Sequence, residues 1–268
     1  MGKPVETRRR ADGEAVLWYS REIPDRAYKE DSMLKQALQC VFGATAILAV
    51  SLATGQGKAK PEWQEKFGIS SCTLQTTGRN EYFILEPGHQ LVLEGGGVKL
   101  HRTVLNETHT VDGVLTRVVE EREWKDGQLY EVARNYFAIC DQTKDVFYFG
   151  EDVAFYENGK VTKTDGSWLA GKGNRAGLMM PGSPQPKMKF YQEIAPGVAM
   201  DRAEIMSLSD TCKTPAGTFQ RCMRVKESSP LDLGVSEYKF HAPGIGLVRD
   251  DKLRLVKHGF IDAAAKGK

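Results

Sequence analysis

Turn signals constrain this chain more than any other feature of its sequence. Four Asx-Gly pairs stand between runs rich in branched and aromatic side chains: Asp112-Gly113, Asp126-Gly127, Asn158-Gly159 and Asp165-Gly166. A two-residue type I′ turn needs a positive φ at both central positions, and Asn or Asp followed by Gly adopts those angles readily. Such tight turns join neighbouring antiparallel strands. The pairs therefore predict an antiparallel meander.

Alternation of apolar and polar residues extends this prediction over residues 80–260. The pattern indicates about ten to twelve strands and no long helix after Gly68. The triplet Gly95-Gly96-Gly97 is interpreted as one more hairpin turn. Because a large antiparallel sheet must curl or close, the predicted fold class is mainly β, with a large curved antiparallel sheet arranged as a half-barrel or a β-sandwich meander.

Upstream of the predicted sheet, residues 36–57 contain no charged side chain. At about 1.5 Å of rise per residue, a helix of this length crosses the ~30 Å hydrocarbon core of a bilayer. The stretch thus predicts a transmembrane or signal-anchor helix. A cleaved signal peptide starting at Met33 and ending at the small-x-small pattern Ser51-Leu52-Ala53 is the alternative. A buried helix of a soluble protein is a third interpretation, but such helices usually show a polar face.

Basic residues beside this stretch set the expected orientation. Four Lys or Arg residues precede it closely and three follow it, which favours a cytoplasmic head. We expect an inner-membrane protein with its C-terminal domain in the periplasm or, after cleavage near Ala53, a protein secreted to the periplasm. The predicted parts are a charged N-terminal head (1–35), a transmembrane or signal-anchor helix (36–57), a juxtamembrane helix and linker (58–79), an antiparallel β domain (80–260) and a flexible tail (261–268).

The charge balance bears on the class of partner. The whole chain has a formal net charge of +2, and residues 61–268 carry 27 basic and 28 acidic side chains. A nucleic-acid surface needs clustered positive charge. We therefore expect no nucleic-acid partner.

Two of the five cysteines flank a predicted hairpin turn. Cys212 and Cys222 lie on either side of Thr214-Pro215-Ala216-Gly217. Cross-strand neighbours approach disulfide geometry, so this pair is a disulfide candidate if the body is exported, against two reduced cysteines. Cys72 and Cys140 are a second possible pair. No Cys or His spacing typical of zinc occurs, and we expect neither a metal site nor a cofactor.

Residues 166–189 are rich in Gly and Pro and are predicted to form a long loop. The loop contains four apolar candidates for ligand or partner contact: Trp168, Leu178, Met179 and Met180. The competing interpretation is a plug that covers one end of the sheet. The five histidines are scattered, and the acidic residues around Glu151 and Asp152 are interpreted as a charged rim of the sheet.

Several longer blocks resemble a known group of proteins. They include NEYFILEPGHQLVLEG (residues 80–95), VFYFGEDVAFYENGKV (146–161) and above all EYKFHAPGIGLV (237–248). In these blocks the chain resembles an uncharacterised exported bacterial β-rich family whose members carry an N-terminal signal or lipoprotein anchor. The resemblance implies a curved antiparallel sheet akin to lipoprotein-carrier half-barrels, and it implies no particular activity. The long charged head departs from the pattern of the group.

No catalytic constellation is visible in the sequence. We expect a non-enzymatic, membrane-anchored, periplasm-facing β domain that binds or braces a protein partner, as an accessory subunit of a membrane complex. One alternative is a carrier for an apolar, lipid-like ligand held between the sheet and residues 166–189. The second alternative is a hydrolase whose site the sequence does not reveal.

Overall fold

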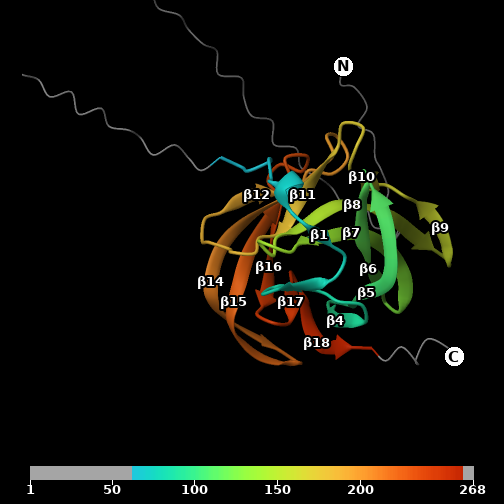
Figure 1. Cartoon of the computed structure of the whole chain (residues 1–268). Helices are drawn as coiled ribbons and strands as arrows, with labels where there is room; N and C mark the ends of the chain where they lie inside the picture. Colours follow the sequence, from blue (N-terminus) through green and yellow to red (C-terminus); the bar gives the residue numbers. More distant parts are fainter. Residues whose placement is uncertain (1–61, 262–268) are drawn as a thin grey trace, which may run out of the picture. The chain divides into compact units, whose positions relative to one another are not determined.

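The computed structural model describes residues 62–261 (Figure 1). The predicted head (1–35), the apolar stretch (36–57) and nearly all of the predicted tail (261–268) lie outside the described residues. No helix within residues 62–261 is long and apolar enough to cross a bilayer. What the structure shows is therefore the β body alone.

Strands make up most of the described chain. Their bounds, after the short 3-10 helix η1 (Ile69–Ser71), are β1 (Leu74–Gln75), β2 (Gly78–Asn80), β3 (Phe83–Leu85), β4 (His89–Gly95), β5 (Val98–Val111), β6 (Val114–Lys125), β7 (Gln128–Cys140), β8 (Val146–Glu157), β9 (Lys160–Lys163), β10 (Trp168–Leu169), β11 (Arg175–Met180), β12 (Lys189–Tyr191), β13 (Glu193–Ile194), β14 (Arg202–Thr214), β15 (Gly217–Ser228), β16 (Ser236–Ala242), β17 (Gly246–Asp250) and β18 (Leu253–Phe260).

One large antiparallel sheet contains nearly all of these strands. Its order is β12-β14-β15-β16-β17-β18-β4-β5-β6-β7-β8-β11-β13, with β1 paired to β7 and with β9 and β10 paired to β8. The sheet curls until β11 comes beside β12, so it forms a nearly closed barrel (Figure 1). A mainly β fold with a curved antiparallel sheet is thus confirmed.

The predicted turns explain the long hairpins of this barrel. Asp112-Gly113, Asp126-Gly127 and Asn158-Gly159 each have positive φ at both residues and join β5 to β6, β6 to β7 and β8 to β9. Gly96 and Gly97 turn β4 into β5 in the same way. Asp165-Gly166 differs, because only the glycine has a positive φ.

An extended segment, residues 62–68, closes the seam of the barrel. Gln64 exchanges two backbone hydrogen bonds of 2.9 Å with β12, through Lys189 and Tyr191. Glu65 forms a 2.8 Å ion pair with Arg175 of β11. The prediction of a helix within residues 58–79 is therefore wrong for residues 62–68. The backbone there forms hydrogen bonds with the edge strand β12 instead of helical hydrogen bonds.

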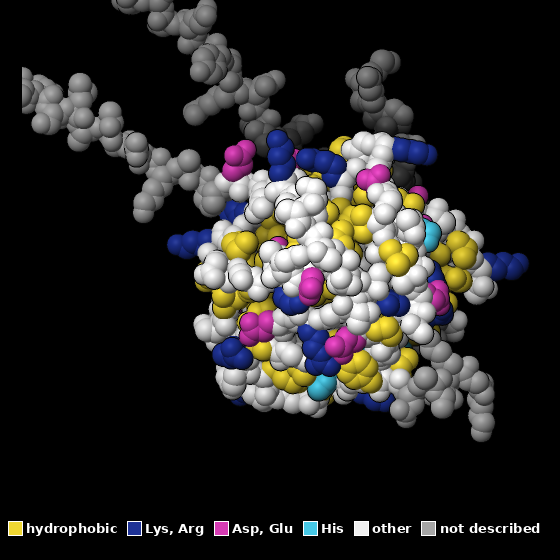
Figure 2. All heavy atoms as spheres, viewed as in Figure 1, with side chains coloured by type: hydrophobic (Ala, Val, Ile, Leu, Met, Phe, Trp, Pro, Cys, Tyr) yellow, Lys and Arg dark blue, Asp and Glu magenta, His cyan; other side chains and the backbone are white. Residues whose placement is uncertain are grey.

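Buried apolar side chains form the core of the barrel. The short hairpin of β2 and β3 inserts Phe83 and Leu85 into this core, where the Phe83 ring meets the Phe137 ring edge-on at 5.1 Å between centroids. On the outer face seen in Figure 2, Lys and Arg side chains are interspersed with Asp and Glu. No single-sign patch dominates that face.

Part of the predicted loop at residues 166–189 forms strands β10 and β11, whereas residues 170–174 and 181–188 lie outside the strands. Both strands pair with β8, and Gly177 opposes Tyr148 in the register. The glycines and prolines of this segment predicted irregular backbone, but Gly177 lies within β11 and allows the backbone of residue 192 to pack closely against that strand. A Cβ there would lie 2.1 Å from the Gln192 carbonyl oxygen.

The disulfide lies between Cys72 and Cys140. It ties the segment after η1 to the end of β7. Cys212 and Cys222 are free, buried thiols, so the structure has the reduced alternative and not the candidate bridge between them. The hairpin register explains the difference, because Cys222 opposes Asp210 and Cys212 opposes Phe219, which offsets the two cysteines along the strands.

Candidate functional site

A polar cavity of about 310 Å³ occupies the interior of the barrel. We call it the acidic cavity, after the seven carboxylates in its lining: Glu121, Glu131, Glu151, Glu193, Asp201, Glu227 and Asp250. Its walls come from strands on all sides of the barrel, from β5 to β8 and from β11, β13, β15, β16 and β17. A volume of this size is at the lower end for small-molecule sites.

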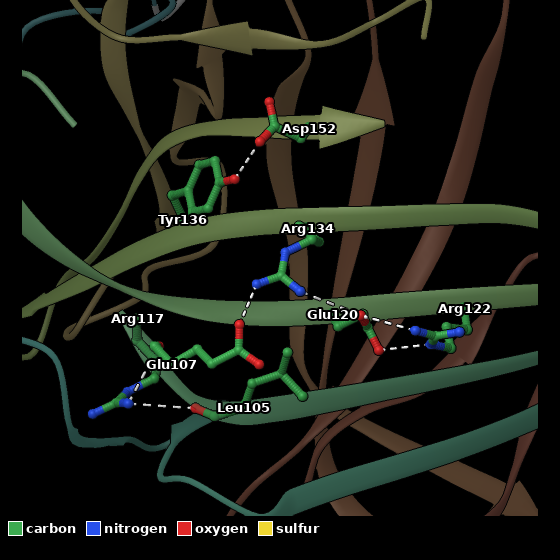
Figure 3. Close-up of polar contacts among 8 residues, drawn as sticks. All are labelled: Leu105, Glu107, Arg117, Glu120, Arg122, Arg134, Tyr136 and Asp152. Atoms are coloured by element: carbon green, nitrogen blue, oxygen red, sulfur yellow. Dashed lines mark hydrogen bonds and ion pairs between the residues drawn. The ribbon is translucent and has the colours of Figure 1, made fainter. Parts of the chain in front are cut away.

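Strand alternation separates the inner acids from an outer charged network on the same strands. On β6, Glu121 faces the cavity, whereas Glu120 lies outside and accepts hydrogen bonds from Arg122 (Figure 3). Arg134 of β7 also pairs with Glu120, at 3.6 Å, and with Glu107 (Figure 3). Outer carboxylates therefore have arginine partners, while most of the inner ones do not.

Two cations balance three of the inner carboxylates. Lys239 Nζ lies 2.7 Å from Glu227 and 3.8 Å from Asp250, and Arg102 Nη1 lies 3.1 Å from Glu121. The remaining carboxylates have no Lys or Arg within ion-pair distance among residues 62–261: Glu131, Glu151, Glu193 and Asp201. The cavity thus carries an excess of acid groups.

This excess raises the proton affinity of the unpaired acids. Burial, followed by the charges of neighbouring carboxylates, raises the pKa of Glu131 to about 7 and that of Glu193 well above its usual range. Burial likewise raises the pKa of Glu151 to about 7, although the polar hydroxyl of Tyr148 opposes the shift. Glu227 behaves differently, because Lys239 outweighs the effect of burial and lowers its pKa. Near neutral pH Glu131 and Glu151 are therefore partly protonated, and a cation can displace these protons.

A buried histidine adds an unpaired acceptor to the same cavity. His241 is 7% exposed, and its Nδ1 has no hydrogen-bond partner. Burial lowers the pKa of His241 to about 3, so the ring is neutral. A buried ring nitrogen without a partner is costly, and an N–H donor from a ligand would satisfy it.

The cavity has a recognisable floor. Arg102, His241 and Leu247 line both the acidic cavity and a water-sized cavity of about 20 Å³ beside Phe83. Phe137 of β7 also lines the acidic cavity and belongs to the hydrophobic core. We call this side of the cavity, which lies against the core and contains His241, its floor.

A second cavity lies at the seam. This seam cavity, of about 500 Å³, shares no lining residue with the acidic cavity. Its apolar walls come from Phe67, Phe147, Leu178 and Met188. Polar groups, among them Asp145 and Gln142, line the rest.

The four apolar residues predicted to contact a ligand do not form one surface. Trp168, Leu178 and Met180 are buried in the core, and the Trp168 ring packs on Tyr148 at 5.5 Å. Leu178 also lines the seam cavity, whereas Met179 lines the acidic cavity. Only these two contacts connect the predicted residues to a cavity.

Sequence reasoning missed the acidic cavity. Glu151 was interpreted as part of a charged rim, but a bulge of β8 at Gly150 turns it inward beside Tyr148. Gly150 has a φ of +135°, and a Cβ there would lie 2.3 Å from the Trp168 carbonyl oxygen. A glycine inside a strand is the available signal for such a bulge.

The cavity residues do not resemble a metal centre or a nucleophile triad. No three Asp, Glu, His or Cys side chains among residues 62–261 are grouped to hold a metal ion. The described lining of the acidic cavity contains no Ser, Thr or Cys. The unpaired carboxylates are instead spread around the wall.

Comparison of the chain with protein-family models, curated proteins and solved structures found no match. The resemblance to an exported β-rich family therefore stays a prediction.

Proposed function

We propose that the barrel binds a small organic polycation, such as a polyamine, in the acidic cavity. Four carboxylates without a cationic partner, Glu131, Glu151, Glu193 and Asp201, carry this proposal. Carboxylates that converge on one point suit a metal ion, whereas carboxylates spread around a wall suit several ammonium groups along a chain. His241 Nδ1 supplies one further acceptor for an N–H donor.

Ligand binding is coupled to proton release. Protons held by Glu131 and Glu151 near pH 7 leave when ammonium groups take their place. In the empty cavity, protonation relieves the mutual repulsion of the carboxylates. In the complex, the positive charges of the ligand offset this repulsion instead.

Calorimetry of the full-length protein with spermidine tests the proposal. We expect saturable binding that releases protons near pH 7 and weakens as salt rises. The variant E151Q/E193Q should bind at least about tenfold more weakly, because each lost charge–charge contact contributes roughly 1 kcal/mol or more. E120Q is the matched control, since Glu120 carries the same charge on the outer face. Absence of binding, or equal binding by all three proteins, would overturn the proposal.

The seam cavity favours a second candidate, the carrier of an apolar ligand. Phe67, Phe147, Leu178 and Met188 give it an apolar wall that the acidic cavity lacks. N-phenyl-1-naphthylamine, whose fluorescence rises in apolar sites, is the probe. M188E should abolish its binding, whereas M206E, at an exposed position of β14, should leave it unchanged. Equal fluorescence of both variants would rule out this candidate.

The membrane anchor, the periplasmic location and the protein partner stay proposals. Their support is the uncharged stretch 36–57 and the near-neutral body.

A further inference from the structure

A loop beside the acidic cavity carries three exposed apolar side chains. Residues 229–235 join β15 to β16, and Leu231, Leu233 and Val235 are 49%, 86% and 66% exposed. We call these three residues the apolar rim. Asp232, the one charged residue of the loop, lines a shallow pocket together with Asp201 and Glu227. Single exposed apolar residues are ordinary, but three within five positions of one loop indicate an interaction surface.

The loop that carries the apolar rim starts close to Trp63, near the beginning of the described chain. Ser228, the last residue of β15, pairs with Arg202 in the register and accepts a 3.4 Å hydrogen bond from its Nε. The Arg202 guanidinium lies 4.4 Å from the centre of the Trp63 ring. Lys189 Nζ lies 5.3 Å from the same ring. A tryptophan flanked by two cations therefore adjoins the apolar loop.

The short segment between the uncharged stretch and Glu62 limits the distance between that stretch and the start of the barrel. The uncharged stretch ends at Gly57, five positions before Glu62. At about 3.5 Å per residue, these five residues reach at most ~17 Å. If residues 36–57 lie in a bilayer, Glu62 is within that reach of its surface, and Trp63 is the next residue. Protein surfaces that lie at the level of the lipid headgroups typically carry tryptophan and basic residues, together with apolar side chains that enter the bilayer.

We propose that the apolar rim rests on the surface of the lipid bilayer that anchors the chain, with Leu231, Leu233 and Val235 inserted at the level of the headgroups. Trp63, Lys189 and Arg202 contact the same interface. The barrel then has a fixed orientation on the membrane instead of turning freely on a linker. This inference rests on the proposed membrane anchor, but it does not depend on the cavity ligand.

Site-specific fluorescence in the full chain tests the orientation. The protein carrying L233C and C40S is labelled with a nitrobenzoxadiazole dye and reconstituted into vesicles of phosphatidylethanolamine and phosphatidylglycerol. Cys72 and Cys140 are bridged, and Cys212 and Cys222 are buried, so the label reports position 233. We expect a blue-shifted emission that brominated lipids quench.

A label at T218C, on the strand that leads into the loop, is the matched control. Thr218 is exposed near the start of β15, ten residues and about 33 Å from Ser228. Its emission should stay that of a water-exposed dye. V235C gives an independent second position for the rim, should L233C fold poorly. Equal, water-like emission at all three positions would overturn the proposal, and so would a full chain that does not float with the vesicles.

Discussion

Replacing Glu151 with glutamine tests the electrostatics of the acidic cavity directly. Burial raises the pKa of Glu151 from 4.5 to about 7. Between these two values the folded protein keeps a proton that the unfolded chain releases. The free energy of unfolding of the wild type therefore falls as pH rises through this window, and the cost is complete above pH 7. Glutamine cannot ionise, so E151Q avoids this cost.

The size of the effect follows from the same values. One pH unit of difference corresponds to about 1.36 kcal/mol, which gives an upper bound near 3 kcal/mol for Glu151. Water in the open cavity and relaxation of Glu193, which then ionises more easily, reduce the gain. We expect E151Q to be about 1–2 kcal/mol more stable than the wild type at pH 8, with the difference vanishing near pH 4.5.

Urea unfolding of both proteins from pH 4 to pH 9 measures this difference. E120Q is again the control, because Glu120 is paired with Arg122 outside the cavity and its loss should bring no gain that grows with pH. A constant difference between E151Q and the wild type across the pH range would refute the reasoning. So would a less stable E151Q at pH 8, which would mean that favourable polar contacts of the Glu151 carboxylate outweigh the repulsion.

Two further predictions concern the frame of the barrel. Replacing Cys72 by serine should cost about 3–4 kcal/mol of stability, because the Cys72–Cys140 disulfide closes a long loop in the unfolded chain; chemical unfolding measures the loss, and an unchanged midpoint would contradict it. G177A should destabilise the barrel by more than about 3 kcal/mol, because its Cβ would lie 2.1 Å from the Gln192 carbonyl oxygen. G113A meets nothing within 4 Å and should cost only the ~1 kcal/mol of a positive φ, so equal thermal shifts for the two variants would contradict the steric account.

The hairpins could be predicted from the sequence because their signals are local. Asp112-Gly113 and Asn158-Gly159 fix turn type through backbone angles that need no tertiary contact. The closing of the barrel was not predictable in this way. It depends on Gln64 reaching β12, and that pairing is set by the packing of segments distant in the chain.

The candidate site was hidden for a related reason. Alternation assigns each strand residue to a face only while the strand is regular. The bulge at Gly150 breaks the alternation of β8 and turns Glu151 inward, so a residue that looked like part of a charged rim faces the cavity. Glu193 lies on the two-residue strand β13, too short to show any periodicity.

The cavity and the apolar rim meet at one end of the barrel, and this has a consequence for binding. The shallow pocket beside Val235 shares Asp201 and Glu227 with the acidic cavity, so a ligand entering there passes the rim.

At an anionic bilayer with a surface potential of about −30 mV, protons are concentrated roughly threefold and a trivalent cation roughly 30-fold. Protons compete with the ligand for Glu131 and Glu151, but the polycation gains far more from the potential than its competitor does. If both proposals hold, spermidine should bind the full chain more tightly in vesicles containing phosphatidylglycerol than in vesicles of phosphatidylcholine alone. Equal apparent affinity in the two would show that the cavity does not open beside the membrane.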